Sequence, residues 1–469
     1  MAKAIHFFNT LSRRLEEFHP LEAGKAGLYT CGPTVYNFVH IGNLRTFVCE
    51  DVLRRTLKAF GYAVTQVQNL TDIDDKTIRG AAAEGVSLRE FTDRYARAFF
   101  EDIATLGIEP AEHYPRATDF IPQMVAIVKR LEERGHTYTL DGSTYYRIAT
   151  FPRYGQLSGI RPSEVLVGAR VDADEYEKED ARDFVLWKAA RPGEPCWDTE
   201  LGRGRPGWHL ECSAMSMHYL GESFDIHAGG VDNIFPHHEN EIAQSEGATG
   251  VVPFVRYWLH AEHLVVEGQK MAKSLGNFYT LRDLLERGHS SLAIRYLLLS
   301  VPYRQKLNFT FEGLKGAHSA VERIGNTLRR LATSPPAGGD GDLDPGFVDA
   351  MRDDFDAAMA DDLNTARALA ALHTLLTRVN QALDGGGISG RARGRLDAAL
   401  GRVQQVLGIL PGDAVPAEGD AEVEALVRER EAARAARDFA RADAIRAELG
   451  QRGIVLEDTP HGTVWHRKT

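Results

Sequence analysis

Two cysteines, a histidine and a glutamate that lie far apart in the chain could together bind a metal ion. Cys31 and Cys212 would supply thiolates, whereas His237 and Glu241 would supply an imidazole and a carboxylate. The last two are four residues apart, so on a helix their side chains share one face. Such a mixture of soft and borderline ligands suits zinc. Ligands from three distant segments predict a tertiary site inside a folded protein, not a local zinc finger.

Simpler interpretations of the same residues remain open. Buried cysteines without a ligand are common, and a histidine–glutamate pair can be an ordinary surface contact. His238 and Glu239 are rival ligands in the same segment. The other two cysteines, Cys49 in a predicted amphipathic helix and Cys196 beside Pro195, are not assigned to the metal. Residue types alone therefore favour two buried cysteines without a metal.

The segment His40-Ile41-Gly42-Asn43 is typical of phosphate binding at the start of a helix. Backbone N–H groups at a helix N-terminus bind phosphate oxygens, and a glycine there allows close approach. His40 could also donate a hydrogen bond to charge that develops on a phosphorus centre. Taken alone, so short a motif favours a simpler interpretation, in which His40 caps the helix and Gly42 serves the turn.

A basic segment further along the chain changes that balance. Lys270 and Lys273 lie three residues apart in a loop that follows the apolar run His263–Val266. A mobile loop with two lysines could close on a polyphosphate, because the lysine ammonium is a compact point charge. Most lysine pairs are merely solvated. Both motifs in this order, on an alternating strand–helix background, are far less frequent by chance.

Alternating strands and helices would position these residues. Strands are predicted over Ala26–Cys31 and Tyr62–Asn69, on either side of a helix over Ile41–Phe60 that Gly61 ends. Strand–helix–strand units of this kind form parallel sheets. A further strand is predicted over Phe224–Gly230. The fold class we predict is α/β: a Rossmann-like parallel-sheet catalytic domain with an insertion, followed by a helical bundle and a small C-terminal α+β unit.

The other regions of the chain have different patterns. Residues Asp141–Asp198 have the character of an insertion, and the chain is predicted to be helical from about Phe311. Pro411–Pro416 has the composition of a linker. Beyond it, Glu422–Thr469 predicts two helices, the second capped by Asp438, and a closing hairpin.

Length and composition exclude several classes of protein. A chain of 469 residues predicts two to four domains. Four cysteines do not make a disulfide scaffold, no apolar run reaches the ~20 residues of a membrane span, and no signal peptide is recognisable. We therefore expect a cytoplasmic protein. The net charge of -11 argues against broad, non-specific nucleic-acid binding but allows a local basic path for one RNA.

Longer segments surround the residues described above: Cys31–Tyr36 leading into His40–Asn43, Asn69–Lys76, Pro206–Met215, Asp225–Gly230 and Phe235–Glu241. On these segments the sequence resembles the class I aminoacyl-tRNA synthetases. Within that class it closely resembles the cysteinyl-tRNA synthetases, over essentially its whole length. Two positions depart from the pattern of the class, which often has a second histidine at the position of Asn43 and a serine at that of Ala272.

The resemblance implies the activity of a cysteine–tRNA ligase. Such an enzyme activates L-cysteine with ATP to cysteinyl-adenylate and pyrophosphate, then transfers the cysteinyl group to the 3′ end of tRNA(Cys). Shape separates near-isosteres such as cysteine and serine only about 10–200-fold, whereas zinc binds a thiolate and lowers its pKa. We therefore expect one zinc per chain that selects the thiol. The resemblance also implies that ATP is a substrate with Mg, and that the protein is a monomer that binds tRNA(Cys) and no membrane.

The resemblance also assigns roles to individual residues. Without it, Trp208 could equally be a core residue, and Gly229–Asp232 a tight turn with an exposed carboxylate. The implied roles are zinc ligands for Cys31, Cys212, His237 and Glu241; the cysteine pocket for Thr71 and Trp208; catalysis for His40, Asn43, Lys270 and Lys273; and ATP binding for His40, Gly42, Asn43, Gly229, Gly230, Asp232 and Lys273.

The C-terminal arginines have two interpretations. Glutamates are interspersed among them, so charge alone favours a solvated, salt-bridged surface. The resemblance favours contact with the anticodon, with Trp465 as a stacking or core residue. The arginines are Arg428, Arg430, Arg434, Arg437, Arg441 and Arg446. The domains we predict are 1–120 and 206–262 for the two catalytic halves, 121–205 for the connective insertion, 263–310 for the mobile loop and stem contacts, 311–410 for the helical bundle and 417–469 for the anticodon-binding unit.

Two other functions remain as alternatives. A cysteine ligase of thiol-cofactor (mycothiol-type) synthesis would make the same adenylate but pass cysteine to an amino-sugar acceptor. Such an enzyme would not need the segment after Pro411. A catalytically silent, synthetase-like binding protein is the second alternative. It would not need His40, both lysines and all four metal ligands.

Overall fold

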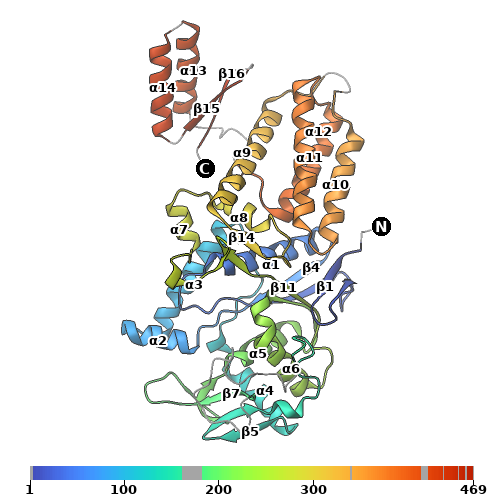
Figure 1. Cartoon of the computed structure of the whole chain (residues 1–469), viewed down its shortest axis with the longest axis vertical. Coiled ribbons are helices and arrows are strands. Elements are labelled where there is room, and N and C mark those ends of the chain that lie inside the picture. Colours follow the sequence, from blue (N-terminus) through green and yellow to red (C-terminus); the bar gives the residue numbers. More distant parts are fainter. Residues whose placement is uncertain are drawn as a thin grey trace. The chain divides into compact units, whose positions relative to one another are not determined.

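The computed structural model describes residues 4–160, 182–337, 341–412, 421–436, 438–452, 454–459 and 462–467 (Figure 1). The chain divides into two compact units. The first contains Met1–Phe311, Asp354–Leu369 and Gln405–Leu407, and the second contains Glu312–Asp353, Ala370–Gln404 and Gly408–Thr469. All residues of the predicted active site belong to the first unit.

A four-stranded parallel sheet forms the centre of the first unit, with the strand order β11-β10-β3-β4. Strand β10 is buried along its whole length, as expected for a parallel sheet covered on both faces. Parallel strands end at the same edge, so residues that follow β3 and β10 meet there. The strands are β3 (Lys25–Thr30), β4 (Ala63–Gln68), β10 (Phe224–Gly230) and β11 (Val255–Ala261). The predicted α/β fold class is confirmed.

Helix α1 (Ile41–Ala59) connects β3 to β4 and begins at the residue that the sequence predicts. His40 is its N-cap, because its Nδ1 atom accepts a hydrogen bond from the backbone N–H of Asn43 at 3.1 Å. The helix ends before Gly61, whose φ of 97° favours glycine. The apolar residues that the sequence spacing places on one face are all buried: Phe47, Val48, Val52, Leu53 and Leu57.

The other helices of this unit pack around the sheet and build one hydrophobic core. Helix α5 contacts β3 and β4, and α4, α5 and α6 also pack against one another. Buried residues of this core include Met215 on α5 and Trp258 on β11. The elements are the hairpin β1 (His6–Asn9) and β2 (Arg14–Glu17), with α2 (Asp75–Glu84), α3 (Leu88–Thr105), α4 (Ile121–Glu133), α5 (Trp208–Leu220) and α6 (Glu239–Thr249).

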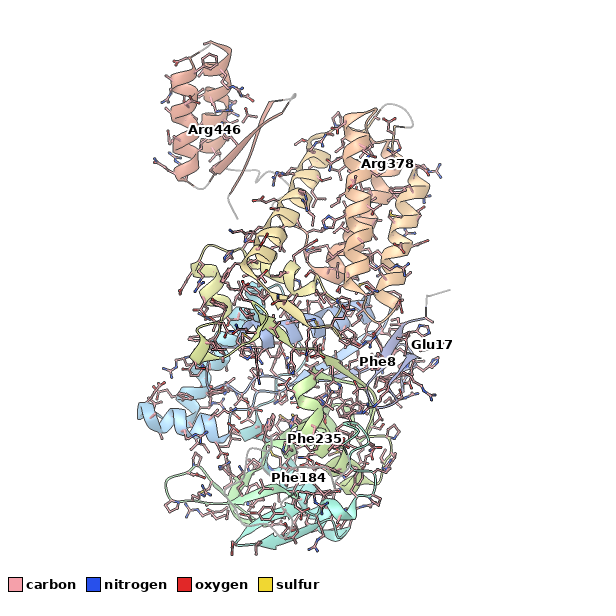
Figure 2. All side chains as sticks on the ribbon, in the orientation of Figure 1. Phe8, Glu17, Phe184, Phe235, Arg378 and Arg446 are labelled. Carbon is pink, nitrogen blue, oxygen red and sulfur yellow. The ribbon has the colours of Figure 1, made fainter. Side chains whose placement is uncertain are left out.

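A five-stranded antiparallel sheet, in the order β5-β6-β7-β9-β8, occupies the region predicted to be an insertion. Phe184 in β7, which is labelled in Figure 2, stacks on Tyr146 in β6 with ring centroids 5.0 Å apart. The strands are β5 (Thr137–Leu140), β6 (Ser143–Tyr146), β7 (Phe184–Ala189), β8 (Trp197–Thr199) and β9 (Gly202–Pro206). This region also contains a stretch rich in charged residues, 172–183, most of which lies outside the described residues.

The predicted mobile-loop region folds as a small sheet followed by two short helices. Strand β12 pairs parallel with β14 and antiparallel with β13, so Lys270 lies at the end of an edge strand. The elements are β12 (Leu264–Val266), β13 (Gln269–Lys270), α7 (Leu281–Glu286), α8 (Ser291–Leu299) and β14 (Leu307–Phe309).

The second unit is mostly helical, as the sequence predicts from Phe311 onward. Hydrogen bonds join its helices: Arg330 donates to Asn380 at 2.6 Å, and Asn380 donates to Thr327 at 2.7 Å. The helices are α9 (Phe311–Thr333), α10 (Pro345–Ala360), α11 (Thr365–Asp384) and α12 (Gly390–Leu407), of which α10 to α12 belong partly to the first unit. Among the described residues, no helix is long and apolar enough to cross a membrane.

The C-terminal segment folds as the predicted α+β unit. Asp438 caps α14 by accepting a hydrogen bond from the backbone N–H of Arg441 at 3.0 Å. The predicted hairpin pairs Ile454 with Arg467 and Thr459 with Gly462. The elements are α13 (Ala421–Ala435), α14 (Phe439–Gln451), β15 (Ile454–Thr459) and β16 (Gly462–Arg467). Arg437 and the linker residues 413–416 lie outside the described residues, as does the side chain of Trp465.

Candidate active site and metal centre

The structure brings together the four residues predicted as metal ligands. Cys31 directly follows β3, and Cys212 lies on α5. His237 lies in the turn before α6, and Glu241 lies in the first turn of α6. One potential ligand atom from each lies within 4.8 Å of the others. These ligands lie close together because β3 and β10 are neighbouring parallel strands that end at the same edge of the sheet. Strand β3 leads to Cys31, and β10 leads to the turn that contains His237.

A rival set of ligands overlaps with this one. Cys31, His227, His238 and Glu241 also have their ligand atoms within 4.8 Å of one another. His238 Nε2 lies 3.2 Å from Cys31 Sγ, and His227 Nε2 lies 3.0 Å from Glu241 Oε2. Geometry alone therefore allows either Cys212 with His237, or His227 with His238, beside Cys31 and Glu241.

The rival carboxylate, Glu239, points elsewhere. Its two oxygens accept hydrogen bonds from the backbone N–H groups of three residues, Gly155, Leu157 and Ser158, at 2.8–3.1 Å. Its side chain is buried and these bonds satisfy it without a cation. Glu239 therefore anchors the segment 155–158, and Glu241 is the carboxylate that faces the cysteines.

Burial opposes charge on every member of the first set. It raises the pKa of the Cys212 thiol and, more strongly, that of Glu241. A hydrogen bond to Cys212 and then burial raise the pKa of Cys31, whereas burial and the neighbouring His209 lower that of His237. A divalent cation would reverse this balance, because it favours thiolate, carboxylate and neutral imidazole.

One buried atom fits such a cation directly. Glu241 Oε1 is fully buried and has no hydrogen-bond donor, although it lies 3.0 Å from His237 Nε2. The two atoms approach each other without the alignment of a hydrogen bond, so we interpret both as facing a common point. Buried carboxylate oxygens are normally satisfied, and the two thiols complete a donor set that suits zinc.

A cleft of about 360 Å³ opens beside this cluster. Trp208 joins the two: its ring stacks on His237 with centroids 4.1 Å apart and an angle of 13°, and 38% of the residue is exposed. Trp208 is therefore not a core tryptophan. The predicted site residues that line the cleft are Cys31, His40, Asn43, Trp208, Gly230 and Asp232.

The lysine loop packs against the start of α1, so the two candidate phosphate motifs are neighbours. The backbone N–H of Ile41 donates to Tyr279 at 2.9 Å, and the rings of His40 and Phe278 are 5.2 Å apart. A Cβ atom on Gly42 would lie only 3.0 Å from the Met271 side chain, so glycine permits this close packing. His40 thus caps α1 and also lines the cleft, so both interpretations of this residue hold.

Among the side chains that the structure describes, the other predicted residues do not line the cleft. Thr71 is buried, and its hydroxyl donates at 2.9 Å to Glu211, the residue before Cys212. A Cβ atom on Gly229 would lie 3.0 Å from the His238 ring. Lys270 is exposed. Lys273 lies in a short 3-10 turn, and its side chain lies outside the described parts of the structure.

Sequence reasoning missed several residues of this site. His209 contacts His237 through their Nδ1 atoms at 2.9 Å, and His260 contacts the Nδ1 atom of His238 at 2.8 Å. Lys76 lines the cleft. His209 lies in the segment Pro206–Met215 and Lys76 in Asn69–Lys76, so the sequence contained a signal for both. Nothing local in the sequence marks His260.

The comparisons with known proteins agree on a class. The family model "tRNA synthetases class I (C) catalytic domain" matches residues 17–319. Methionyl-tRNA synthetase from Mycobacterium tuberculosis has a similar fold, with a TM-score of 0.61 and 16% identity over 84% of this chain and 92% of that one. The leucyl-tRNA synthetase of Agrobacterium radiobacter K84, in a ternary complex, gives 0.59 at 12% identity over 84% and 85%. Fold and cleft together define a class I aminoacyl-tRNA synthetase.

Further matches narrow the class to one family. A DALR domain model matches residues 354–411, and a model of the cysteinyl-tRNA ligase anticodon binding domain matches 417–465. Cysteine–tRNA ligases of Solibacter usitatus (strain Ellin6076) and Koribacter versatilis (strain Ellin345) are 51% and 49% identical, each over 99% of this chain and 100% of the relative. The chain belongs to the cysteine–tRNA ligase family.

Proposed function

We propose that this chain activates L-cysteine with ATP and transfers the cysteinyl group to the 3′ end of tRNA(Cys). One observation carries the proposal: a single cleft contains the helix-start motif of His40 and Asn43 and also opens onto the cysteine cluster at Cys31. A phosphate-binding motif and a thiol-binding site must adjoin in an enzyme that joins cysteine to a nucleotide. Membership of the family supports the same reaction.

The metal in this proposal is zinc, one per chain, held by Cys31, Cys212, His237 and Glu241. When bound, zinc would accept the substrate thiol as a thiolate and lower its pKa, which a serine hydroxyl would resist. The stacking of Trp208 on His237 supports this choice of histidine over His238, because Trp208 lines the cleft and its ring holds the His237 ring beside it. His238 instead lies between Cys31 and His260.

The nucleotide part of the proposal assigns a position to each group of ATP. The start of α1 would hold the phosphates with Mg, and Lys270 and Lys273 would stabilise charge on the departing pyrophosphate. Gly230 and Asp232, which line the cleft at the end of β10, would approach the ribose. Positioning and electrostatics would supply the rate, since the reaction needs no covalent nucleophile from the protein.

The domain division follows the same proposal. The five-stranded antiparallel sheet supports an insertion over 121–205 between the catalytic segments 1–120 and 206–262. Residues 263–310 would contact the tRNA stem, 311–410 would form the helical bundle, and 417–469 would read the anticodon. The anticodon-domain match supports the last assignment and counts against an amino-sugar acceptor. We also propose that the enzyme acts as a monomer.

A comparison of acceptors tests the proposed function. Purified protein is incubated with cysteine, Mg and ATP, and either tRNA(Cys) or a glucosamine-based acceptor. We expect cysteinyl-tRNA and no product with the amino sugar. Formation of the amino-sugar product without charging of tRNA would overturn the proposal in favour of thiol-cofactor synthesis. Absence of both products and of any cysteine-dependent use of ATP would favour a silent binding protein.

A further inference from the structure

Exposed aromatic side chains gather at the cleft. Among the described residues, the exposed large aromatic side chains are Tyr36, Phe38, Trp208 and Phe439, and the first three line this single cleft. Trp208 is accounted for by its contact with His237 beside the cysteine cluster. Tyr36 and Phe38, 38% and 39% exposed, have no part in the proposed binding of zinc, cysteine or ATP. Exposed apolar surface grouped in a concave site usually marks a ligand.

Both rings lie beside positive charge, and Phe38 is also held by a second aromatic ring. The Lys76 ammonium lies 5.5 Å from the centre of the Tyr36 ring, and the Arg282 guanidinium lies 5.0 Å from that of Phe38. Tyr95 and Phe38 form a T-shaped contact with ring centroids 5.6 Å apart. Phe38 is therefore preorganised despite its exposure, which lowers the entropic cost of binding a ligand on it.

Arg282 is itself fixed by two carboxylates. It pairs with Glu101 at 2.6 Å and with Asp102 at 3.1 Å, both on α3. Its main effect on Phe38 is therefore to hold the ring between α3 and α7. Lys76 is different, because its ammonium is exposed at the start of α2. Its charge is available to a phosphate of the ligand.

The proposed reaction requires one more ligand in this cleft. In the second step, the terminal ribose of the tRNA must reach the adenylate, and the last nucleotides of a tRNA are unpaired. Proteins bind unpaired nucleotides by stacking bases on aromatic rings and placing cations beside the phosphates. We propose that Tyr36 and Phe38 form the stacking platform for the unpaired 3′ end of the tRNA, with Lys76 beside its backbone. This inference rests on the proposed function.

The surroundings of Phe38 distinguish this ligand from ATP. Phe38 is held by α3 and α7, whereas the candidate ribose residues, Gly230 and Asp232, lie at the end of β10. The platform and the nucleotide residues thus belong to different elements that border one cleft. An adenylate on the β10 side would leave the two rings for the incoming tRNA.

The test compares Phe38→Leu, which keeps an apolar side chain but removes the aromatic face, with Phe38→Trp, which restores one. Three quantities are measured: cysteine-dependent pyrophosphate exchange without tRNA, single-turnover transfer of cysteine to tRNA(Cys), and relative affinity for tRNA(Cys) transcripts ending in CCA or in CC. The matched control is Phe100→Leu, a partly buried aromatic of α3 that packs against Tyr114 and does not line the cleft.

We expect Phe38→Leu to slow transfer roughly tenfold more than it slows exchange, the size of one lost base stack. It should also lose the preference for CCA over CC ends, and Phe38→Trp should regain it. A variant in which exchange falls as much as transfer would overturn the inference and assign the ring to ATP or cysteine. Unchanged transfer and an unchanged preference would overturn it outright. If the wild-type protein charges no tRNA at all, the proposed function itself fails, which is a separate outcome.

Discussion

Glu239 and Glu241 show how two carboxylates in one short segment acquire different roles. Both are buried, and burial raises the pKa of each. Backbone N–H groups partly offset this effect at Glu239 and leave its carboxylate a structural anchor. Nothing comparable offsets it at Glu241, whose Oε1 atom has no donor. A bound cation is the partner that would make Glu241 stable as a carboxylate.

Substitution of one thiol tests the metal centre at the scale of a residue. Cys212→Ser should lose most of the zinc measured by elemental analysis, because a hydroxyl is a harder and weaker ligand than a thiolate. Cysteine binding should weaken with it. The matched control is Cys196→Ser, a cysteine of the β8 region whose Sγ accepts from Arg203. Zinc at full occupancy in the Cys212 variant, or an equal loss in the control, would count against the assigned ligands.

At the scale of elements, much of the site could be predicted and part could not. The two ends of α1 follow from local signals, the capping pair His40–Asn43 and Gly61. These signals act over a few residues, so a single sequence contains them. The placement of His227 and His238 beside Cys31 depends on how β10 and β3 pair, and the N–H donors of Glu239 come from a segment over eighty residues away. Contacts of that range leave no local pattern, which is why the rival ligands remained undecided.

His40 has two roles in helix α1 that one pair of variants separates. Asparagine is a good N-cap, so His40→Asn should keep the unfolding temperature of the protein while slowing adenylate formation by roughly 10²–10³. His40→Ala should lose both the catalytic group and the cap, at a further cost of about 1 kcal/mol in unfolding free energy. Thermal unfolding and pyrophosphate exchange provide the two readouts. Normal exchange in His40→Asn would reduce the histidine to a capping residue.

Asp102 on α3 makes the stability of the first unit depend on pH. Burial raises its pKa to about 6, although Arg282 acts in the opposite direction. An acid whose pKa is raised in the folded state binds its proton more tightly there, so its contribution to stability falls as pH rises from about 4 to about 6. Asp102→Asn cannot ionise. Its unfolding temperature should therefore rise relative to the wild type across this window, and a constant difference between pH 4 and 7 would refute the assignment.

At the scale of the whole molecule, the C-terminal unit has the features of a separate binding module. It has a hydrophobic cluster of its own, formed by Val423, Val427, Ile445, Leu449, Ile454 and Leu456. All residues of the candidate active site precede it in the chain. Its loss should therefore leave the catalytic fold intact, since a domain with its own core can fold and be removed independently.

Truncation after about Pro411 tests this separation. Cysteine-dependent pyrophosphate exchange should remain close to that of the full chain, whereas charging at limiting tRNA should fall roughly tenfold or more, the effect of losing about 1.4 kcal/mol of tRNA binding. The kinetics of charging over a range of tRNA concentrations would show whether the defect lies in binding. A truncated protein that charges as well as the full chain would mean that residues 417–469 do not read the tRNA.

The central claim is that one cleft selects cysteine by its thiol and activates it with ATP. The most direct measurement is ATP–pyrophosphate exchange by the full chain, with cysteine, serine or alanine as the amino acid at equal concentrations. The account predicts exchange with cysteine and a preference over serine well above the 10–200-fold that shape alone provides. Exchange that does not depend on cysteine, or that proceeds equally well with serine, would contradict it.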